Sequence, residues 1–189
     1  MKTRVVFTIV VLLILSLSAF AAEDQGTIFI IRHAEKLSKA PDALLSPAGH
    51  ARANCLAHLL GEANIQTVFT SNIRRTHQTA SPLARARHLT IQTIPKDNPD
   101  ELVLKAKAAA QNGDVLIVGH QETVADIVQR LGGGTMPRVD PNEFDRLTIL
   151  HLTPSGATVT ILRYCDCGAP IGAQPGVDQG MSPAASAPH

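Results

Sequence analysis

Aromatic residues are scarce in this chain, which has no Trp, one Tyr and five Phe among 189 residues. A hydrophobic core must therefore be built from Leu, Ile, Val and Ala. The three cysteines are too few for the disulfide framework of a small secreted scaffold. The one long hydrophobic run, residues 5–17, is too short for a comfortable membrane span.

No excess of charge of one sign is present either, because 17 basic residues stand against 16 acidic ones. A strongly basic face would indicate nucleic acid or an anionic membrane surface as a partner. We therefore expect no nucleic-acid partner.

The N-terminus has the pattern of a secretory signal peptide. Lys2 and Arg4 precede the hydrophobic run, and Ala19-Phe20-Ala21 follows it as a small-x-small cleavage site. We predict that residues 1–21 are removed and that the protein is exported, to the periplasm or the medium, with no stable membrane association afterwards. Loss of the two basic residues leaves 15 against 16 acidic ones, a net charge of −1. An uncleaved membrane anchor is the alternative.

The rest of the chain divides into a domain at 22–167 and a tail at 168–189. The tail consists mainly of Ala, Pro, Gly and Ser, with little to bury, and is predicted to be disordered. Cys55 lies in an Ala/Leu-rich helical segment, where we expect a buried structural thiol. In an oxidising compartment Cys165 and Cys167 could pair with each other, with Cys55 or with a partner.

Strand-like and helix-like segments alternate along the domain. Ser46-Pro47 and Asn98-Pro99 are typical helix starts, with a polar N-cap followed by Pro at the first helical position. Two further helices are expected at 73–87 and 123–131, and strands at 27–31, 66–70, 89–94, 115–119, 146–152 and 158–163. The pattern predicts an α/β three-layer sandwich with a mostly parallel sheet, an antiparallel edge hairpin and helices on both faces.

Polar side chains follow three of the expected strands at their carboxyl ends. Arg32-His33 follows the first strand, Arg74-Arg75 lies just after the second, and His120 ends the fourth. In parallel α/β sheets, ligands bind beyond the carboxyl ends of the strands. We expect Arg32, Arg75 and His120 to bind a phosphoryl group beside His33, because guanidinium donors match phosphate oxygens and neutral imidazole is a competent nucleophile.

Four motifs in this order resemble the histidine phosphatase superfamily, also called phosphoglycerate-mutase-like. They are Arg32-His33-Ala34-Glu35-Lys36, Leu45-Ser46-Pro47-Ala48-Gly49 with Arg52-Ala53, Thr70-Ser71 through Ala80, and Val118-Gly119-His120. The resemblance covers about residues 27–164 and implies a small exported bacterial-type member. It implies that His33 becomes a phosphohistidine, that Arg32 and Arg75 bind phosphate, and that His120 completes the catalytic set.

The family's proton donor does not carry over. The mutase-type Leu-x-Glu is absent after the third strand, and His120-Gln121 replaces the His-Asp pair of the acid phosphatases. Asp97, Glu122 and Glu35 are the candidates. A phosphoanhydride or phosphoramidate leaving group would need less protonation, so the missing acid bears on the substrate.

The sequence thus predicts a metal-independent phosphoric-ester hydrolase that uses no cofactor and acts on a phosphorylated substrate, which we expect to be a small molecule. Histidine spacing indicates no zinc site, and two pocket arginines would repel a cation. Segments 35–44 and 132–143 are expected to border the entrance. The alternatives are a non-catalytic protein that binds a phosphoryl ligand and, among enzymes, a protein-phosphohistidine phosphatase.

Overall fold

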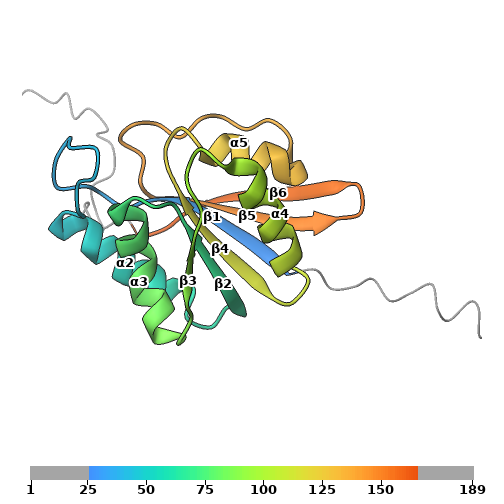
Figure 1. Cartoon of the computed structure of the whole chain (residues 1–189), viewed down its shortest axis with the longest axis horizontal. Coiled ribbons are helices and arrows are strands. Elements are labelled where there is room, and N and C mark those ends of the chain that lie inside the picture. Colours follow the sequence, from blue (N-terminus) through green and yellow to red (C-terminus); the bar gives the residue numbers. More distant parts are fainter. Residues whose placement is uncertain (1–25, 166–189) are drawn as a thin grey trace, which may run out of the picture.

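A computed structural model describes residues 26–165 (Figure 1). The predicted signal peptide and the predicted tail lie outside the described residues, and the predicted domain boundaries at 22 and 167 fall just beyond them. The elements are β1 (Thr27–Arg32), α2 (Pro47–Leu59), β2 (Ile65–Thr70), α3 (Arg74–Ala86), β3 (Ile91–Thr93), α4 (Pro99–Ala109), β4 (Asp114–Gly119), α5 (Val124–Val128), η2 (Gln129–Gly133), β5 (Arg146–Thr153) and β6 (Gly156–Arg163).

Six strands of the described part form one sheet in the order β3-β2-β4-β1-β5-β6. β1, β2, β3 and β4 pair in parallel, whereas β5 is antiparallel to β1 and to β6. α2 and α3 lie on one face of the sheet, and α4 and α5 on the other (Figure 1). The predicted fold class, a three-layer α/β sandwich with an antiparallel edge hairpin, is confirmed.

Two hydrophobic layers hold the sandwich together, one on each face of the sheet. Leu56 of α2 and Leu83 of α3 pack on Val68 and Leu116 on one face. On the other face Ile127 of α5 lies in the cluster that covers the opposite side of β1 and β4. Side chains of successive strand residues point to opposite faces, so the apolar central residues of β1 and β4 fill both layers.

The helix starts follow the predicted capping chemistry. The Ser46 side chain accepts a hydrogen bond from the Gly49 amide at 3.1 Å, and the Asn98 side chain accepts one from the Glu101 amide at 3.4 Å. Each cap satisfies an amide that has no partner within its helix. α2 and α4 therefore begin where the sequence places them.

Two elements are shorter than expected. β3 covers three residues rather than 89–94, because the chain is still closing α3 at Leu89, whose amide donates to the carbonyl of Ala84. α5 ends at Val128 and continues as the π-helical turn η2, in which Gly132 has a φ of +97°. That conformation strongly favours glycine, so the run of glycines ends the helical segment about one turn beyond the end of α5.

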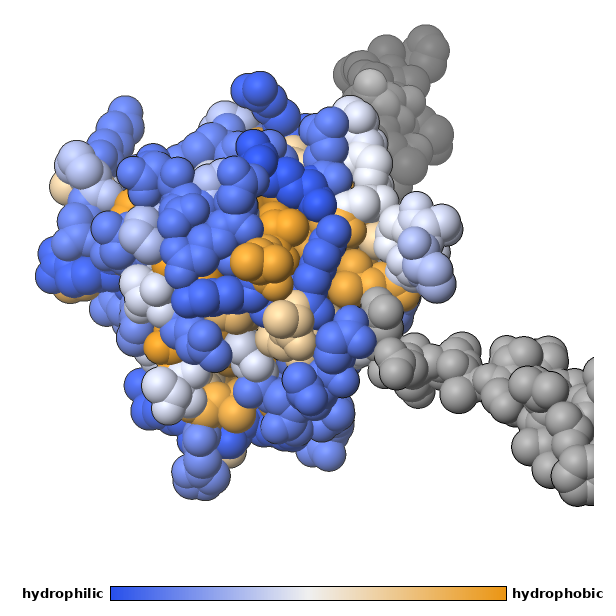
Figure 2. All heavy atoms as spheres, turned by 45° about the vertical axis from the view of Figure 1, so that its right-hand side comes forward, coloured by the Kyte–Doolittle hydropathy of each residue, from blue (hydrophilic) through white to orange (hydrophobic). Residues whose placement is uncertain are grey.

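Hydrophobic side chains reach the surface at several places in the described part of the chain. On the side shown in Figure 2, hydrophobic patches lie among hydrophilic residues. Large exposed hydrophobic side chains of the described part include Leu37, Leu44, Leu59, Leu104, Ile161 and Leu162. No helix among residues 26–165 has the length and hydropathy that a membrane span requires.

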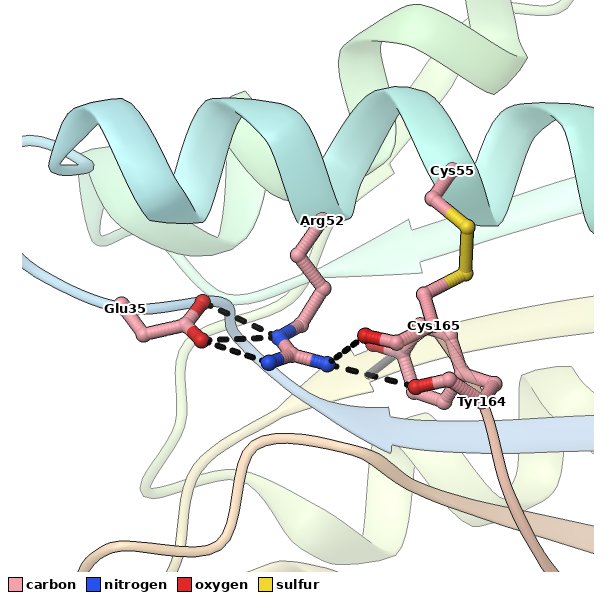
Figure 3. The surroundings of a disulfide bond; sticks show 5 residues. All are labelled: Glu35, Arg52, Cys55, Tyr164 and Cys165. Atoms are coloured by element: carbon pink, nitrogen blue, oxygen red, sulfur yellow. Dashed lines mark hydrogen bonds and ion pairs between the residues drawn. A yellow bond between two sulfur atoms is a disulfide. The ribbon is translucent and has the colours of Figure 1, made fainter. Parts of the chain in front are cut away.

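Cys55 and Cys165 form a disulfide that joins α2 to the chain just after β6 (Figure 3). The expectation of a buried thiol at Cys55 was therefore wrong. One of the pairings left open for Cys165 is the one observed, and Cys167 lies outside the described residues. The bridge closes a separation of 110 residues, which no local sequence pattern reveals.

Candidate active site

The carboxyl ends of β1, β2 and β4 bring the predicted site residues together. Strand register places Arg32 opposite Gly119 and Thr70 opposite Val118, so the residues that follow each strand lie side by side. His33 and His120 have ring centroids 5.4 Å apart. Each of the four predicted residues, Arg32, His33, Arg75 and His120, is buried.

His33 follows β1 directly, and its side chain is fixed by the backbone next to it. Its Nδ1 lies 2.7 Å from the carbonyl oxygen of Ala34. Because a carbonyl oxygen only accepts, Nδ1 carries the proton and the lone pair is on Nε2. Burial lowers the pKa of His33 from 6.5 to about 3, against the opposing effect of the Ala34 carbonyl. At neutral pH this histidine is an uncharged imidazole with Nε2 free to attack.

Arg32 ends β1 and is anchored by a neighbouring loop. Its Nη1 donates to the carbonyls of Asp140, Pro141 and Glu143 at 2.9, 2.8 and 3.1 Å. Its guanidinium also stacks 4.0 Å from the centre of the Phe144 ring. The Nε of Arg32 is buried without a hydrogen-bond partner among the described residues. The predicted entrance segment 132–143 is therefore what orients this arginine.

Arg75, rather than Arg74, lies beside His120 in the buried cluster. Its Nη1 donates to the carbonyl of Pro41 at 2.6 Å, and its Nη2 lies 3.3 Å from Nδ1 of His120. The Nε of Arg75 is also buried without a partner among residues 26–165. Arg74 is exposed and paired with Asp42 at 2.6 Å. The other predicted entrance segment, 35–44, thus holds the second pocket arginine.

His120 is held in one tautomer by its two neighbours. A guanidinium only donates, so Nδ1 accepts from Arg75 and Nε2–H donates to Oγ of Ser71 at 2.8 Å. Oγ of Ser71 is in turn hydrogen-bonded to Oγ1 of Thr76 at 3.0 Å. Burial, followed by the charge of Arg75, lowers the pKa of His120 from 6.5 to about 4. This second imidazole is also uncharged at neutral pH.

Two positive guanidiniums and two neutral imidazoles therefore lie in one buried cluster. Buried donors without partners cost free energy unless a ligand accepts from them. The Nε groups of Arg32 and Arg75 are two such donors, and a phosphoryl group offers them anionic oxygens in fixed geometry. The pocket is thus suited to an anion placed next to a nucleophilic nitrogen.

The three candidate proton donors lie in different surroundings. Glu35 has both carboxylate oxygens hydrogen-bonded to Arg52, and Asp97 is exposed in the turn before α4. Glu122 pairs with Lys96 at 3.2 Å, and Lys96 lines a small cavity together with His120. Burial raises the pKa of Glu122, but its own backbone amide and Lys96 outweigh that effect and hold it below its usual value. The structure brings neither Glu35 nor Asp97 into the pocket.

Some residues that shape the site were not assigned a role from the sequence. Ser71 fixes the His120 tautomer, Phe144 stacks on Arg32, and the buried Glu143 ties its loop to Arg146 and to the Asp140 amide. Ser71 could have been found, because it directly follows β2 at the same sheet edge. Phe144 and Glu143 lie in an irregular segment that gives no periodic signal.

The other histidines among residues 26–165 lie away from this cluster. His50, His58, His77, His88 and His151 are all exposed, as expected for surface residues. Among residues 26–165 no group of three or more His, Cys, Asp or Glu side chains could hold a metal ion.

A buried cluster of two guanidiniums and two neutral histidines, at the carboxyl ends of parallel strands, is suited to phosphoryl chemistry. The family model of the histidine phosphatase superfamily (branch 1) matches residues 28–96. Over these residues the match confirms the resemblance to that superfamily, and with it the predicted enzyme class, phosphoric-ester hydrolases of the histidine phosphatase type. A sequence search of curated proteins gave no match.

Solved structures of phosphatases share the fold. The α-ribazole phosphatase from Shigella flexneri is 18% identical with a TM-score of 0.60, over 72% of this chain and 96% of that one. The protein histidine phosphatase SixA complexed with tungstate is 21% identical, with a TM-score of 0.59, over 73% and 95%. A phosphoserine phosphatase from Entamoeba histolytica, in complex with 3-phosphoglyceric acid, is 16% identical, with a TM-score of 0.58, over 72% and 95%. At these identities the likeness establishes the fold.

Proposed function

We propose that this protein is a phosphatase that hydrolyses a phosphate monoester or a related phosphoryl compound through a phosphohistidine on His33. The observation that carries the proposal is the unprotonated Nε2 of His33, held in a pocket with two guanidinium donors that lack partners among the described residues. Attack by imidazole needs no metal ion, so the proposed reaction is metal-independent.

The reaction proceeds in two steps. Arg32 and Arg75 bind the phosphoryl oxygens, and Nε2 of His33 forms a bond to phosphorus while the bond to the leaving oxygen or nitrogen breaks. The Nδ1–H of His33 stays hydrogen-bonded to the Ala34 carbonyl, which stabilises the positive charge that develops on the ring. Water then attacks phosphorus, and the P–N bond breaks to release phosphate and neutral His33.

Glu122 is the candidate that best fits the role of proton donor. Its charge acts on both His120 and Arg32, which places it close to the pocket. Its ion pair with Lys96 and its lowered pKa keep Glu122 ionised at neutral pH, so it seldom carries the proton that a general acid must donate. We therefore favour substrates whose leaving group departs with little protonation, such as phosphoramidates, phosphoanhydrides and aryl esters.

A protein-phosphohistidine phosphatase is a second candidate within the same chemistry. A P–N bond suits a site that lacks an effective proton donor for the leaving group, and the fold is shared with the SixA phosphatase. Against it stands the proposed export, because residues 1–21 would carry the protein away from cytoplasmic phosphorelay partners. We therefore propose a small phosphorylated molecule, met in the periplasm or the medium, as the substrate.

The decisive experiment is hydrolysis of p-nitrophenyl phosphate from pH 4 to 8 with EDTA, beside the His33→Ala variant. This ester has a good leaving group, so it tests the nucleophile and the pocket independently of a proton donor. We expect turnover that persists in EDTA and is abolished in His33→Ala, with an unchanged circular dichroism spectrum. Folded protein without turnover, but with phosphate binding by calorimetry, would support the non-catalytic binding protein instead.

A further inference from the structure

Glu35, two residues after the nucleophile, is held by a buried arginine from α2. Nε of Arg52 donates to both carboxylate oxygens of Glu35 at 2.9 and 3.0 Å, and Nη2 donates to one of them at 2.7 Å. Arg52 is only 7% exposed. Figure 3 shows the carboxylate and the guanidinium facing each other. Such a multiply bonded, largely buried pair fixes both side chains much more firmly than a surface ion pair does.

The same guanidinium also contacts the residues that directly follow β6. Nη1 of Arg52 donates to the carbonyls of Tyr164 and Cys165 at 3.2 and 2.6 Å. The disulfide then ties Cys165 back to Cys55, which lies one turn after Arg52 on α2 (Figure 3). Residues three apart on a helix share a face, so one face of α2 holds both the arginine and the carbonyls that support it.

The peptide group between Ala34 and Glu35 connects this arrangement to the nucleophile. Its carbonyl is the acceptor that fixes Nδ1–H of His33, so any displacement of Glu35 moves the group that orients the imidazole. The same segment is held by Oγ1 of Thr79, which accepts from the Ala34 amide at 3.0 Å, and by the Ser46 amide, which donates to the Glu35 carbonyl at 2.9 Å. Those two contacts hold the backbone of this segment, whereas Arg52 holds the side chain of Glu35.

We propose that Arg52 is a positioning residue for His33, acting through Glu35, and that the Cys55–Cys165 disulfide supports it and makes turnover sensitive to the redox state of the protein. The proposal rests on the phosphatase function proposed above. The Arg52 guanidinium is engaged by Glu35 and by the carbonyls of Tyr164 and Cys165, so we expect its loss to slow attack by His33 and to leave the binding of phosphate to Arg32 and Arg75 nearly intact.

The first test is a double-variant cycle with p-nitrophenyl phosphate. We expect Arg52→Met and Glu35→Gln each to lower kcat at least about tenfold, with KM and inhibition by inorganic phosphate within about threefold of wild type. The double variant should be no slower than either single one, because both remove the same contact. Arg87→Met is the matched control: Arg87 also donates to a carbonyl, that of Gly61 at 2.7 Å just beyond the end of α2, and its loss should leave kcat within about twofold.

The second test varies the disulfide, in a Cys167→Ser background that excludes exchange with the third cysteine. Reduction with a phosphine, or the Cys55→Ser/Cys165→Ser pair, should lower kcat severalfold in otherwise wild-type protein and have no further effect in Arg52→Met. Should Arg52→Met fail to fold, Arg52→Gln serves in its place, since a glutamine lacks the charge and the fork of donors that hold the carboxylate and the two carbonyls.

Each outcome decides between the alternatives. A folded Arg52 variant with wild-type kcat, additive losses in the cycle, or a KM that rises as much as kcat falls would overturn the positioning role. An equal effect of reduction with and without Arg52 would overturn the redox link. The same assay tests the phosphatase function separately, through the wild-type protein and the His33→Ala variant. If the wild-type protein shows no turnover that His33→Ala abolishes, both proposals fail.

Discussion

Acidification should destabilise this protein through its two buried histidines. His33 and His120 have folded-state pKa values of about 3 and about 4, against 6.5 for an ordinary histidine. Between about pH 4 and pH 6.5 both histidines are mostly protonated in the unfolded chain and mostly neutral in the native protein. Stability is therefore full above pH 6.5 and falls as the pH is lowered toward 4.

The size of the effect follows from the same pKa values. At pH 5 each unfolded histidine lies about 1.5 pH units below its pKa, while each native one is still almost entirely neutral. At about 1.4 kcal/mol per unit, each histidine costs about 2 kcal/mol between pH 7 and pH 5, or about 4 kcal/mol together. This is a large fraction of the stability of an ordinary domain.

Urea denaturation at pH 5, 6 and 7 in phosphate-free buffer measures the effect directly. His33→Gln and His120→Gln should each remove about half of the pH dependence, because glutamine does not titrate. His77→Gln, at an exposed position on α3, is the control and should leave the slope as it is. A free energy of unfolding that does not change between pH 7 and pH 5, or a slope that neither pocket variant reduces, would refute the neutral histidine pair.

Three further predictions concern single side chains. Arg75→Lys should lower kcat/KM for p-nitrophenyl phosphate at least about tenfold, because a point charge replaces a planar fork of donors, and Arg74→Lys should not; equal effects would show that the wrong arginine has been assigned. Glu122→Gln should slow hydrolysis of an alkyl ester such as glycerol phosphate more than that of p-nitrophenyl phosphate, and an equal loss on both would exclude Glu122 as proton donor. Ser46→Ala should cost about 1 kcal/mol in urea denaturation by removing the N-cap of α2, with no change in kcat.

The fold was predictable where local chemistry decides it. The Ser46 and Asn98 caps, the apolar strand 115–119 and the alternating hairpin each carry a pattern set by neighbours in the chain, and each was found. β3 is short because the Leu89 amide still donates to the Ala84 carbonyl at the end of α3. Hydrophobic periodicity does not reveal such a backbone hydrogen bond.

The site was predictable only in part, for a physical reason. His33, Arg32, Arg75 and His120 stand at strand ends, so the rule for parallel sheets places them together. Their anchors come from loops: Arg32 is held by carbonyls 108 to 111 residues away, and carbonyls carry no side-chain identity that a sequence could reveal. The disulfide and the Arg52 contacts likewise depend on how residues 164–165 pack against α2, which only the tertiary structure shows.

The most direct test of the central claim is to trap the covalent intermediate. The protein is mixed rapidly with a ³²P-labelled substrate, quenched in alkali, and digested for mass spectrometry, because phosphohistidine is stable to base and labile to acid. The account predicts a base-stable, acid-labile phosphoryl group on His33 that disappears in His33→Ala. Turnover without any labelled protein, or a phosphoryl group on another residue, would contradict it.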